Sequence, residues 1–362
     1  MLKQRNSSIE LLRIIAMLMI ISHHLVEKNV FNVYEQAVGF RKFFFQTILF
    51  SGGKIGVVMF FTITAWFFLD RELTVKGTLK RVWLMEREML FWSIILCAVF
   101  IVFARPMMTG GTVVKSLLPL TFGLWWYPTS YALFLLLLPF LFKGLKSLGK
   151  DMHRALTIIV LAVWGVAGLI PMTHTADNAT GVFGLCMLFI LIAYYRWYCG
   201  PCSVRMAWLL IVSGYLLIMV CWLIVNLIWM KTGQFANYAV FAAGDWKPAP
   251  VMIGFGLFIL FERKTFYSRI INTVAASAFG VYLIHMYPQV ITLLWHDWFD
   301  IGKYYSSPWA PCIAVGIVLF VYLACTVLDI IRRGIFLCTI DRHRGIWFER
   351  LCTKLVARLN QI

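Results

Sequence analysis

Long apolar runs, separated by short polar or Pro/Gly-containing connectors, repeat along nearly the whole chain. A helix needs roughly 20 apolar residues to cross about 30 Å of hydrocarbon, and most of the runs approach or exceed that length. The runs cover residues 8–26, 47–69, 89–103, 117–142, 155–171, 181–198, 207–230, 251–261, 270–295 and 308–331. This pattern predicts an all-α polytopic membrane protein with about ten transmembrane helices, of which the third and eighth are short enough to be tilted or re-entrant.

Lysine and arginine are distributed unevenly among the connectors. The connectors rich in basic residues alternate with poorer ones and cover residues 71–87, 143–154, 196–205 and 263–269. By the positive-inside rule the rich side is cytoplasmic, and both basic termini belong to it, which agrees with an even number of spans. We therefore expect one membrane domain over residues 1–331. Residues 332–362 should form a basic, amphipathic cytoplasmic tail on anionic lipid.

The first run carries four ionisable side chains, which are Glu10, Arg13, His23 and His24. Such groups are costly inside hydrocarbon and are functional-site candidates. At about 100° per residue, Arg13 and His24 share one face at depths roughly 16 Å apart, whereas His23 points about 80° away from Arg13. Glu10 lies three residues before Arg13 and can pair with it. The spacing favours His24 over His23, against a simpler interpretation in which these residues only mark the two ends of an anchor.

The composition restricts the class of protein. Of 362 residues, 61% are hydrophobic and only 14% are charged, against about 25% charged in an average soluble protein. A net charge of +17 would suggest nucleic acid as the partner of a soluble protein. Here the basic residues lie in membrane connectors, so we expect no nucleic-acid binding.

Two further patterns in the sequence are compatible with a redox site and a metal site, but neither has the context that such a site needs. Cys199 and Cys202 form a Cys-x-x-Cys pair, but a short linker between two spans is not the βαβ context in which that motif is a redox site. We interpret it as a chance match. The histidines lack the neighbouring carboxylates that a zinc site would need, and we expect no bound metal.

Five motifs occur in the order found in one protein family. They are Glu10-Leu-Leu-Arg13-Ile-Ile-Ala16 followed by His24, the Ser51 to Thr64 stretch with Gly56, Phe60 and Phe61, the Leu118 to Tyr131 stretch, Leu257 to Phe261 before a basic loop, and Ala278 to His285. Together they resemble the acyltransferase-3 family of membrane acyltransferases over nearly the full length. The resemblance is closest to the branch found with polysaccharide biosynthesis in Gram-positive bacteria. Thr64-Ala65-Trp66 departs from the family's usual Ser-Gly-aromatic turn.

The resemblance implies an O-acyltransferase that moves an acyl group, expected to be acetyl, from cytoplasmic acyl-CoA to a hydroxyl of a cell-surface or lipid-linked glycan. The acyl-CoA is then a donor substrate, and no permanently bound cofactor is expected. Its phosphates would be held on the inner side by basic residues. The candidates are Arg13, Lys80, Arg81 and Arg87, the last three spaced more loosely than the family's arginine pair.

The candidate catalytic residues are His24 and Glu10, with His24 as the general base for the acceptor hydroxyl. Candidates for the acceptor or a second site are Trp126, Tyr127, Tyr131, Tyr282 and His285. His285 lies roughly 22 Å along the predicted ninth span, at a depth similar to that of His24. It could equally be a packed, hydrogen-bonded histidine. The aromatic residues of the fourth span could stack on a sugar or belong to an interfacial belt.

Two other classes of function stay open at this point. One is a transporter for a small metabolite, in which the buried charges line a path; it predicts two matching half-chains, which we do not find. The other is a catalytically silent membrane sensor or scaffold. For all three we expect a multi-pass protein of a bacterial plasma membrane. The leading hypothesis adds acyl-CoA and a hydroxyl acceptor as partners, and homo-oligomers are compatible with it.

Overall fold

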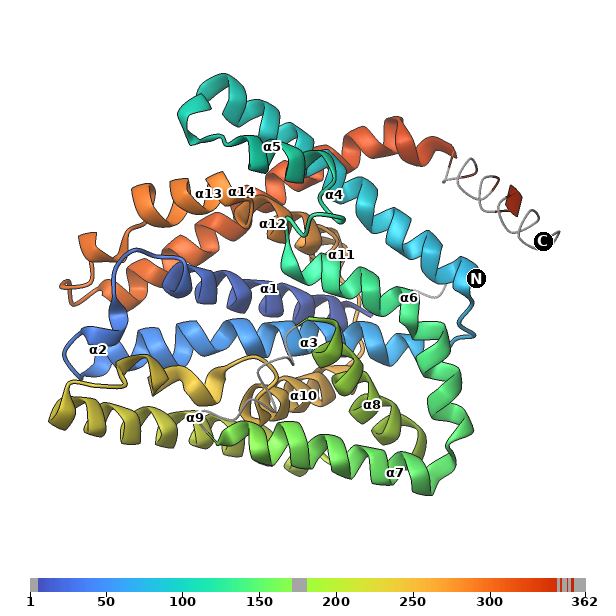
Figure 1. The fold of residues 1–362 in the computed structure, drawn as a ribbon, viewed down its shortest axis with the longest axis horizontal. Helices are drawn as coiled ribbons and strands as arrows, with labels where there is room; N and C mark the ends of the chain where they lie inside the picture. Colours follow the sequence, from blue (N-terminus) through green and yellow to red (C-terminus); the bar gives the residue numbers. More distant parts are fainter. Residues whose placement is uncertain (1–5, 171–180, 344–345, 347–349, 351–352, 355–362) are drawn as a thin grey trace.

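The computed structural model describes residues 6–170, 181–343, 346, 350 and 353–354. Within these residues the regular structure is helical, without strands, and short 3₁₀ or π turns join several of the helices (Figure 1). The α-helices are α1 (Ser7–Glu27), α2 (Phe40–Phe43), α3 (Ser51–Phe68), α4 (Val75–Phe103), α5 (Gly110–Leu117), α6 (Trp126–Ser147), α7 (Gly149–Val160), α8 (Val182–Tyr198), α9 (Val204–Thr232), α10 (Pro248–Glu262), α11 (Arg269–Ala275), α12 (Ala278–His285), α13 (Pro288–Ile291) and α14 (Ala310–Cys338).

The structure supports a multi-pass helical membrane protein but does not confirm ten spans. Six helical segments of the described chain are long and apolar enough to cross a membrane, and they are Ser7–Glu27, Phe40–Phe68, Trp126–Ser147, Gly149–Leu169, Val204–Thr232 and Ala310–Cys338. The bent pair Arg269–His285 and Pro288–Lys303 makes a seventh if it is counted as one span.

The structure has fewer candidate spans than the sequence predicts because some of the apolar runs form helices that are short or that contain charged residues. α4 has 29 residues, but all of its charged side chains lie in its first half, so only the second half is apolar. α8 and α10 have 17 and 15 residues. A helix of that length is shorter than the roughly 20 residues that a perpendicular span needs, and it can also be a helix buried in the protein.

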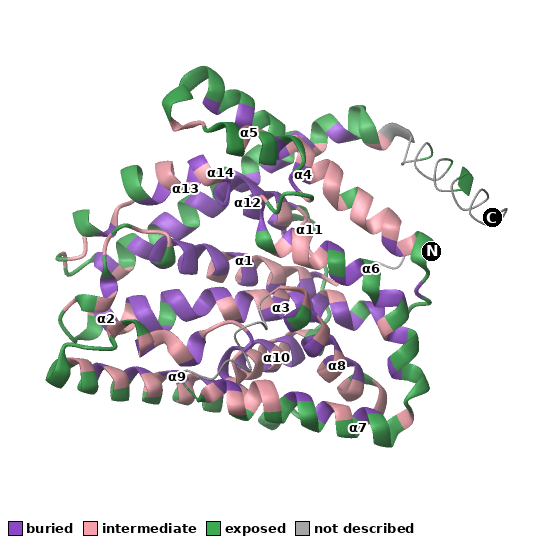
Figure 2. Cartoon of the chain, in the orientation of Figure 1, coloured by how far each residue is buried: buried purple, intermediate pink, exposed green. Residues whose placement is uncertain are grey.

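α1 occupies the centre of the bundle. Its first turn is capped by Asn6, whose side chain accepts a hydrogen bond from the Ser8 main-chain N–H, as expected for an asparagine N-cap. Helices α3, α10, α11, α12 and α14 all contact it. In Figure 2 most of α1 and α3 is coloured as buried, whereas α7 and α9 contain many exposed and intermediate residues. Of the ionisable residues of α1, His23 and His24 are buried among protein side chains, whereas Arg13 and Glu27 are partly exposed.

The predicted ninth span is broken. The chain bends by 84° between the segment that ends at His285 and the one that begins at Pro288. A proline is well suited to the first position of a new helix but cannot continue an existing one without losing a hydrogen bond. As a result His285 is the last residue of α12, not a position midway along a straight helix.

The predicted fourth span starts later than its apolar run. Residues 118–125 form turns, and α6 begins only at Trp126. Tyr127 and Tyr131, one and five residues into α6, are half-buried and belong to the packed interior of the bundle. Two of the three aromatic residues predicted for this span thus pack inside the bundle, whereas Trp126 is exposed.

A buried ionic cluster fixes α12 against α4 and α14. Asp329 of α14 is fully buried and accepts a hydrogen bond from Arg332 Nε at 2.7 Å. Arg332 also pairs with Glu88 of α4 at 3.0 Å. On the other side of the carboxylate lies Gly280 of α12, where a Cβ would be only 1.9 Å from Asp329 Oδ1. Glycine at this position lets α12 sit directly on the cluster.

Helix α1 begins and α14 ends toward the same end of the bundle (Figure 1). α14 continues to Cys338 without a break, beyond residue 331, where the sequence placed the start of the tail. Most of the residues from 344 onward lie outside the described part of the chain, so the amphipathic tail stays a prediction. The cytoplasmic location of both ends is likewise a prediction.

Candidate active site

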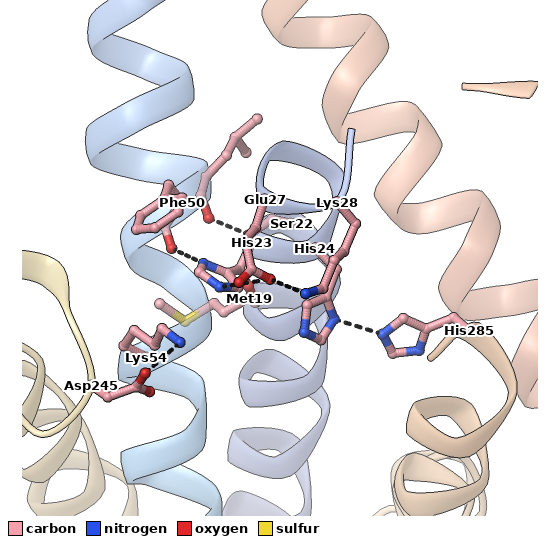
Figure 3. Close-up of polar contacts among 11 residues, drawn as sticks. Met19, Ser22, His23, His24, Glu27, Lys28, Phe50, Lys54, Asp245 and His285 are labelled. Carbon is pink, nitrogen blue, oxygen red and sulfur yellow. Dashed lines mark hydrogen bonds and ion pairs between the residues drawn. The ribbon is translucent and has the colours of Figure 1, made fainter. Parts of the chain in front are cut away.

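Two adjacent histidines near the end of α1 face different neighbours (Figure 3). The Nδ1–H of His23 donates to the main-chain carbonyl of Phe50, just before α3, at 2.6 Å. His24 faces α12, where its Nδ1 lies 3.0 Å from Nε2 of His285. The three histidines are at most 6% exposed. The rotation of about 100° between consecutive helical residues separates the two α1 side chains in this way. His24 and His285, placed at similar depth from the sequence, are in contact.

Close packing of α3 on α1 depends on glycine. A Cβ at Gly53 would lie 2.3 Å from the Cβ of His23, and a Cβ at Gly56 would lie 2.5 Å from the carbonyl oxygen of Ala16. Both distances are far below van der Waals contact, so only glycine allows the two backbones to approach this closely. The glycine-containing motif at the start of α3 therefore presses that helix against the histidine-bearing turn of α1.

A cavity of about 430 Å³ opens beside His24, and part of its lining is aromatic. Trp126 and Tyr127 of α6 and Tyr282 of α12 contribute to that part. The ring centroid of Tyr282 is 6.4 Å from that of His24 and 5.9 Å from that of His285. The Tyr282 hydroxyl is buried beside the main chain of Tyr127 and has no well-aligned hydrogen-bond partner among the described residues. Tyr282 and His24 line the same cavity.

Another part of the cavity lining is charged. Lys54 of α3 pairs with Asp245 at 2.9 Å, and Glu27 lies 3.2 Å from Lys28 Nζ and 3.5 Å from His23 Nε2. All five side chains line the cavity. The sequence pattern does not single out Lys54, Asp245, Glu27 or Lys28 as site residues, and it favours His24 over His23. Lys54 interrupts an apolar run, so the criterion applied to the first run would have found it, whereas Asp245 precedes an apolar run and carries no such signal.

A row of tyrosines connects this cavity with two arginines. Tyr131 of α6 is within electrostatic reach of Arg81 on α4 and Arg13 on α1. Its ring stacks on Tyr127, with centroids 6.1 Å apart and an interplanar angle of 5°. Tyr127 in turn approaches the Tyr282 ring edge-on at 6.4 Å. The structure thus joins two of the predicted donor-binding residues to His24 through three of the predicted acceptor-site residues.

The remaining predicted residues lie elsewhere. Glu10 stays beside Arg13, with 3.8 Å between Oε2 and Nε, and is roughly 21 Å from His24 along the helix axis. Arg87 forms an ion pair with Asp341, 2.6 Å apart, just after α14. Lys80 is half-buried on α4, one residue before Arg81. The structure does not bring Glu10 to the histidines or Arg87 to Arg13.

The two thiols of the cysteine pair are not joined in a disulfide. Cys199 and Cys202, in the linker between α8 and α9, are both free. Burial raises the pKa of the Cys202 thiol, which disfavours the thiolate that redox chemistry requires. Within the described residues, no three or more His, Cys, Asp or Glu side chains are grouped so that they could hold a metal ion.

Comparison with protein-family models matches residues 6–328 to the acyltransferase domain of the acyltransferase-3 family. The matched segment contains the cavity, the tyrosine row and both arginines. No curated protein and no solved structure matches the chain.

Proposed function

The chain belongs to the acyltransferase-3 family, and from that premise we propose that it is a membrane O-acyltransferase with His24 as its general base. The donor is a cytoplasmic acyl-CoA, most simply acetyl-CoA, and the acceptor is a hydroxyl of a cell-surface or lipid-linked glycan. The observation that carries the proposal is the position of His24, which lines the cavity and hydrogen-bonds His285. The family match favours this function over a transporter or a silent sensor.

The donor end is supported by Arg13 and Arg81, which both lie close to Tyr131. Guanidinium groups bind phosphates through charge-assisted, often bidentate hydrogen bonds, and coenzyme A carries several phosphates. Arg13 precedes His24 by roughly 16 Å along α1. An extended pantetheine arm could cover such a distance along the tyrosine row and present the thioester to His24. Arg87 is engaged by Asp341, so we now assign the donor phosphates to Arg13 and Arg81, with Lys80 near them.

Acyl transfer needs a general base for the acceptor hydroxyl and a hydrogen-bond donor for the oxyanion that develops on the thioester carbonyl. His24 removes the proton of the acceptor hydroxyl, and the resulting alkoxide oxygen attacks the thioester carbonyl carbon. We assign the hydrogen-bond donor for the negatively charged oxygen of the tetrahedral intermediate to the Tyr282 hydroxyl, because Tyr282 lines the same cavity as His24. The carbon–sulfur bond then breaks, and the CoA thiolate takes the proton from the His24 imidazolium. The products are the O-acyl ester and free CoA.

The acceptor is best accommodated by the charged part of the cavity. Carboxylates such as Glu27 and Asp245 accept hydrogen bonds from hydroxyl groups, and each is balanced by a lysine. Trp126, 38% exposed at the same cavity, offers an apolar face for a sugar ring. This combination suits a neutral, polyhydroxylated acceptor.

Mass spectrometry of glycan from cells that carry single variants tests the proposal. His24→Ala should lower acylation about 10²- to 10⁴-fold, the usual range for a general base, while CoA binding to the purified protein is largely kept. His23→Ala should cost much less, because the Nε2 of His23 already faces Glu27. Undiminished acylation by well-expressed His24→Ala would remove the catalytic assignment.

A further inference from the structure

A line of three hydrogen-bonding groups runs from the backbone of α12 to the cavity. The main-chain carbonyl of Val281 lies 2.6 Å from Nδ1 of His285, and Nε2 of His285 lies 3.0 Å from Nδ1 of His24. His285 is fully buried, and it forms no ion pair with a carboxylate among the described residues. Of the four ring nitrogens of His24 and His285, only Nε2 of His24 has no protein hydrogen-bond partner among the described residues.

The direction of each hydrogen bond follows from the first one. A carbonyl oxygen only accepts, so Nδ1 of His285 must carry a proton. A neutral imidazole has one N–H and one lone pair, so the Nε2 of His285 is an acceptor. Nδ1 of His24 must then carry the proton that is shared with it. The lone pair of His24 is left on Nε2, the ring nitrogen that does not face His285, and His24 lines the cavity.

His23 differs from His24 because no second histidine in the described part of the chain contacts its Nδ1. Its Nδ1–H also donates to a carbonyl, that of Phe50, and its second nitrogen is therefore the basic one. That nitrogen, however, lies 3.5 Å from the carboxylate of Glu27, which favours a proton on it. Of the two adjacent histidines at the cavity, only His24 keeps an unoccupied basic nitrogen.

We propose that His285 is a positioning residue, which fixes the tautomer and ring orientation of His24 so that Nε2 is the basic atom in the cavity. The inference rests on the proposed function, because it assumes that His24 acts as the base. His285 touches neither substrate, and its effect passes entirely through His24. The fixed end of the line is the helix itself, since Val281 and His285 are one turn apart on α12. A base oriented in advance pays no reorganisation cost during proton transfer.

The test compares two replacements of His285 that differ in one property. His285→Gln keeps an acceptor oxygen near the position of Nε2. His285→Leu introduces a side chain of similar size that has no hydrogen-bond acceptor. We expect His285→Leu to lower kcat for acyl transfer about 10²-fold, with little change in KM for acetyl-CoA, because misplacement of a catalytic group acts on the chemical step. His285→Gln should recover most of that loss. His153→Leu is the matched control, because His153 is also fully buried and bonded to a carbonyl, that of Ile190, but lies far from the cavity on α7.

The outcomes separate the inference from the function. Full kcat in His285→Leu, with His24→Ala inactive, overturns the inference and leaves the proposed function intact. Equal losses in the Gln and Leu variants, at wild-type melting temperature and KM, also overturn it, because shape and not the acceptor would then matter. Full activity in His24→Ala overturns the proposed function itself. A double variant His24→Ala, His285→Leu should be no less active than His24→Ala alone, because both changes act on one group.

Discussion

Replacement of Gly53 by alanine should damage the site through a single added carbon. The new Cβ would lie 2.3 Å from both Cβ and Cγ of His23, whereas carbon atoms in contact are about 3.5 Å apart or more. One of the two helices must therefore move by about 1.2 Å. Overpacking of this kind costs about 1–3 kcal/mol of stability. Because His24 is the next residue along the same helix, a shift of that size should also lower acyl transfer by up to about 10²-fold.

Activity and thermal unfolding of the purified protein in lipid nanodiscs measure both effects. Gly316→Ala is the matched control, because Gly316 is an exposed residue inside α14 where an added Cβ meets nothing within 4 Å. That change should leave activity unaltered and raise stability slightly, by about 0.5–1 kcal/mol. If Gly53→Ala unfolds at the wild-type temperature and transfers acyl groups at the wild-type rate, α3 does not press on the histidine turn as the structure indicates.

The donor assignment predicts that the double variant Arg13→Ala, Arg81→Ala loses saturable binding of acetyl-CoA, measured by calorimetry. Wild-type binding should weaken with salt, because Arg13 is partly exposed and its phosphate contacts are screened; full binding by the double variant would contradict the placement. The topology predicts that a cysteine at Ala37 is labelled by an impermeant reagent from outside and one at Ser147 only from inside. Both positions are exposed, and the exposed native cysteines must first be removed. The same side for both would mean that a span was miscounted.

The helical character of the chain could be predicted because apolar runs of this length leave few alternatives. The number of spans could not, because hydropathy does not distinguish a helix that crosses the bilayer from one buried by its neighbours. α10 illustrates this, since its 15 residues are almost entirely apolar and it is packed between α1, α3 and α9. The break after His285 had a signal in Pro288, but the apolar run continues through it and concealed the bend.

The sequence predicts that His24 and His285 lie at a similar depth, but not that they are in contact. Counting residues along two helices gives the level of each side chain in the bundle, but not whether the helices are neighbours or which nitrogen faces which. For Arg87 the sequence gives no sign of the partner that it has in the structure. Its place among the basic residues of α4 predicts a phosphate ligand, which stays a prediction, but does not indicate its ion pair with Asp341, more than 250 residues away in the sequence. Pairings of this kind depend on tertiary packing and leave no local pattern.

The stack of Tyr127 on Tyr131 has a consequence for the proposed transfer across the membrane. The cavity is lined by Tyr127 but not by Tyr131, Arg13 or Arg81, so the stacked rings lie between the arginines and the cavity. Under the proposed function, the pantetheine arm must displace or pass these rings to reach His24. Under that function, packed aromatic side chains at this point would restrict the passage of water and ions between the donor side and the cavity.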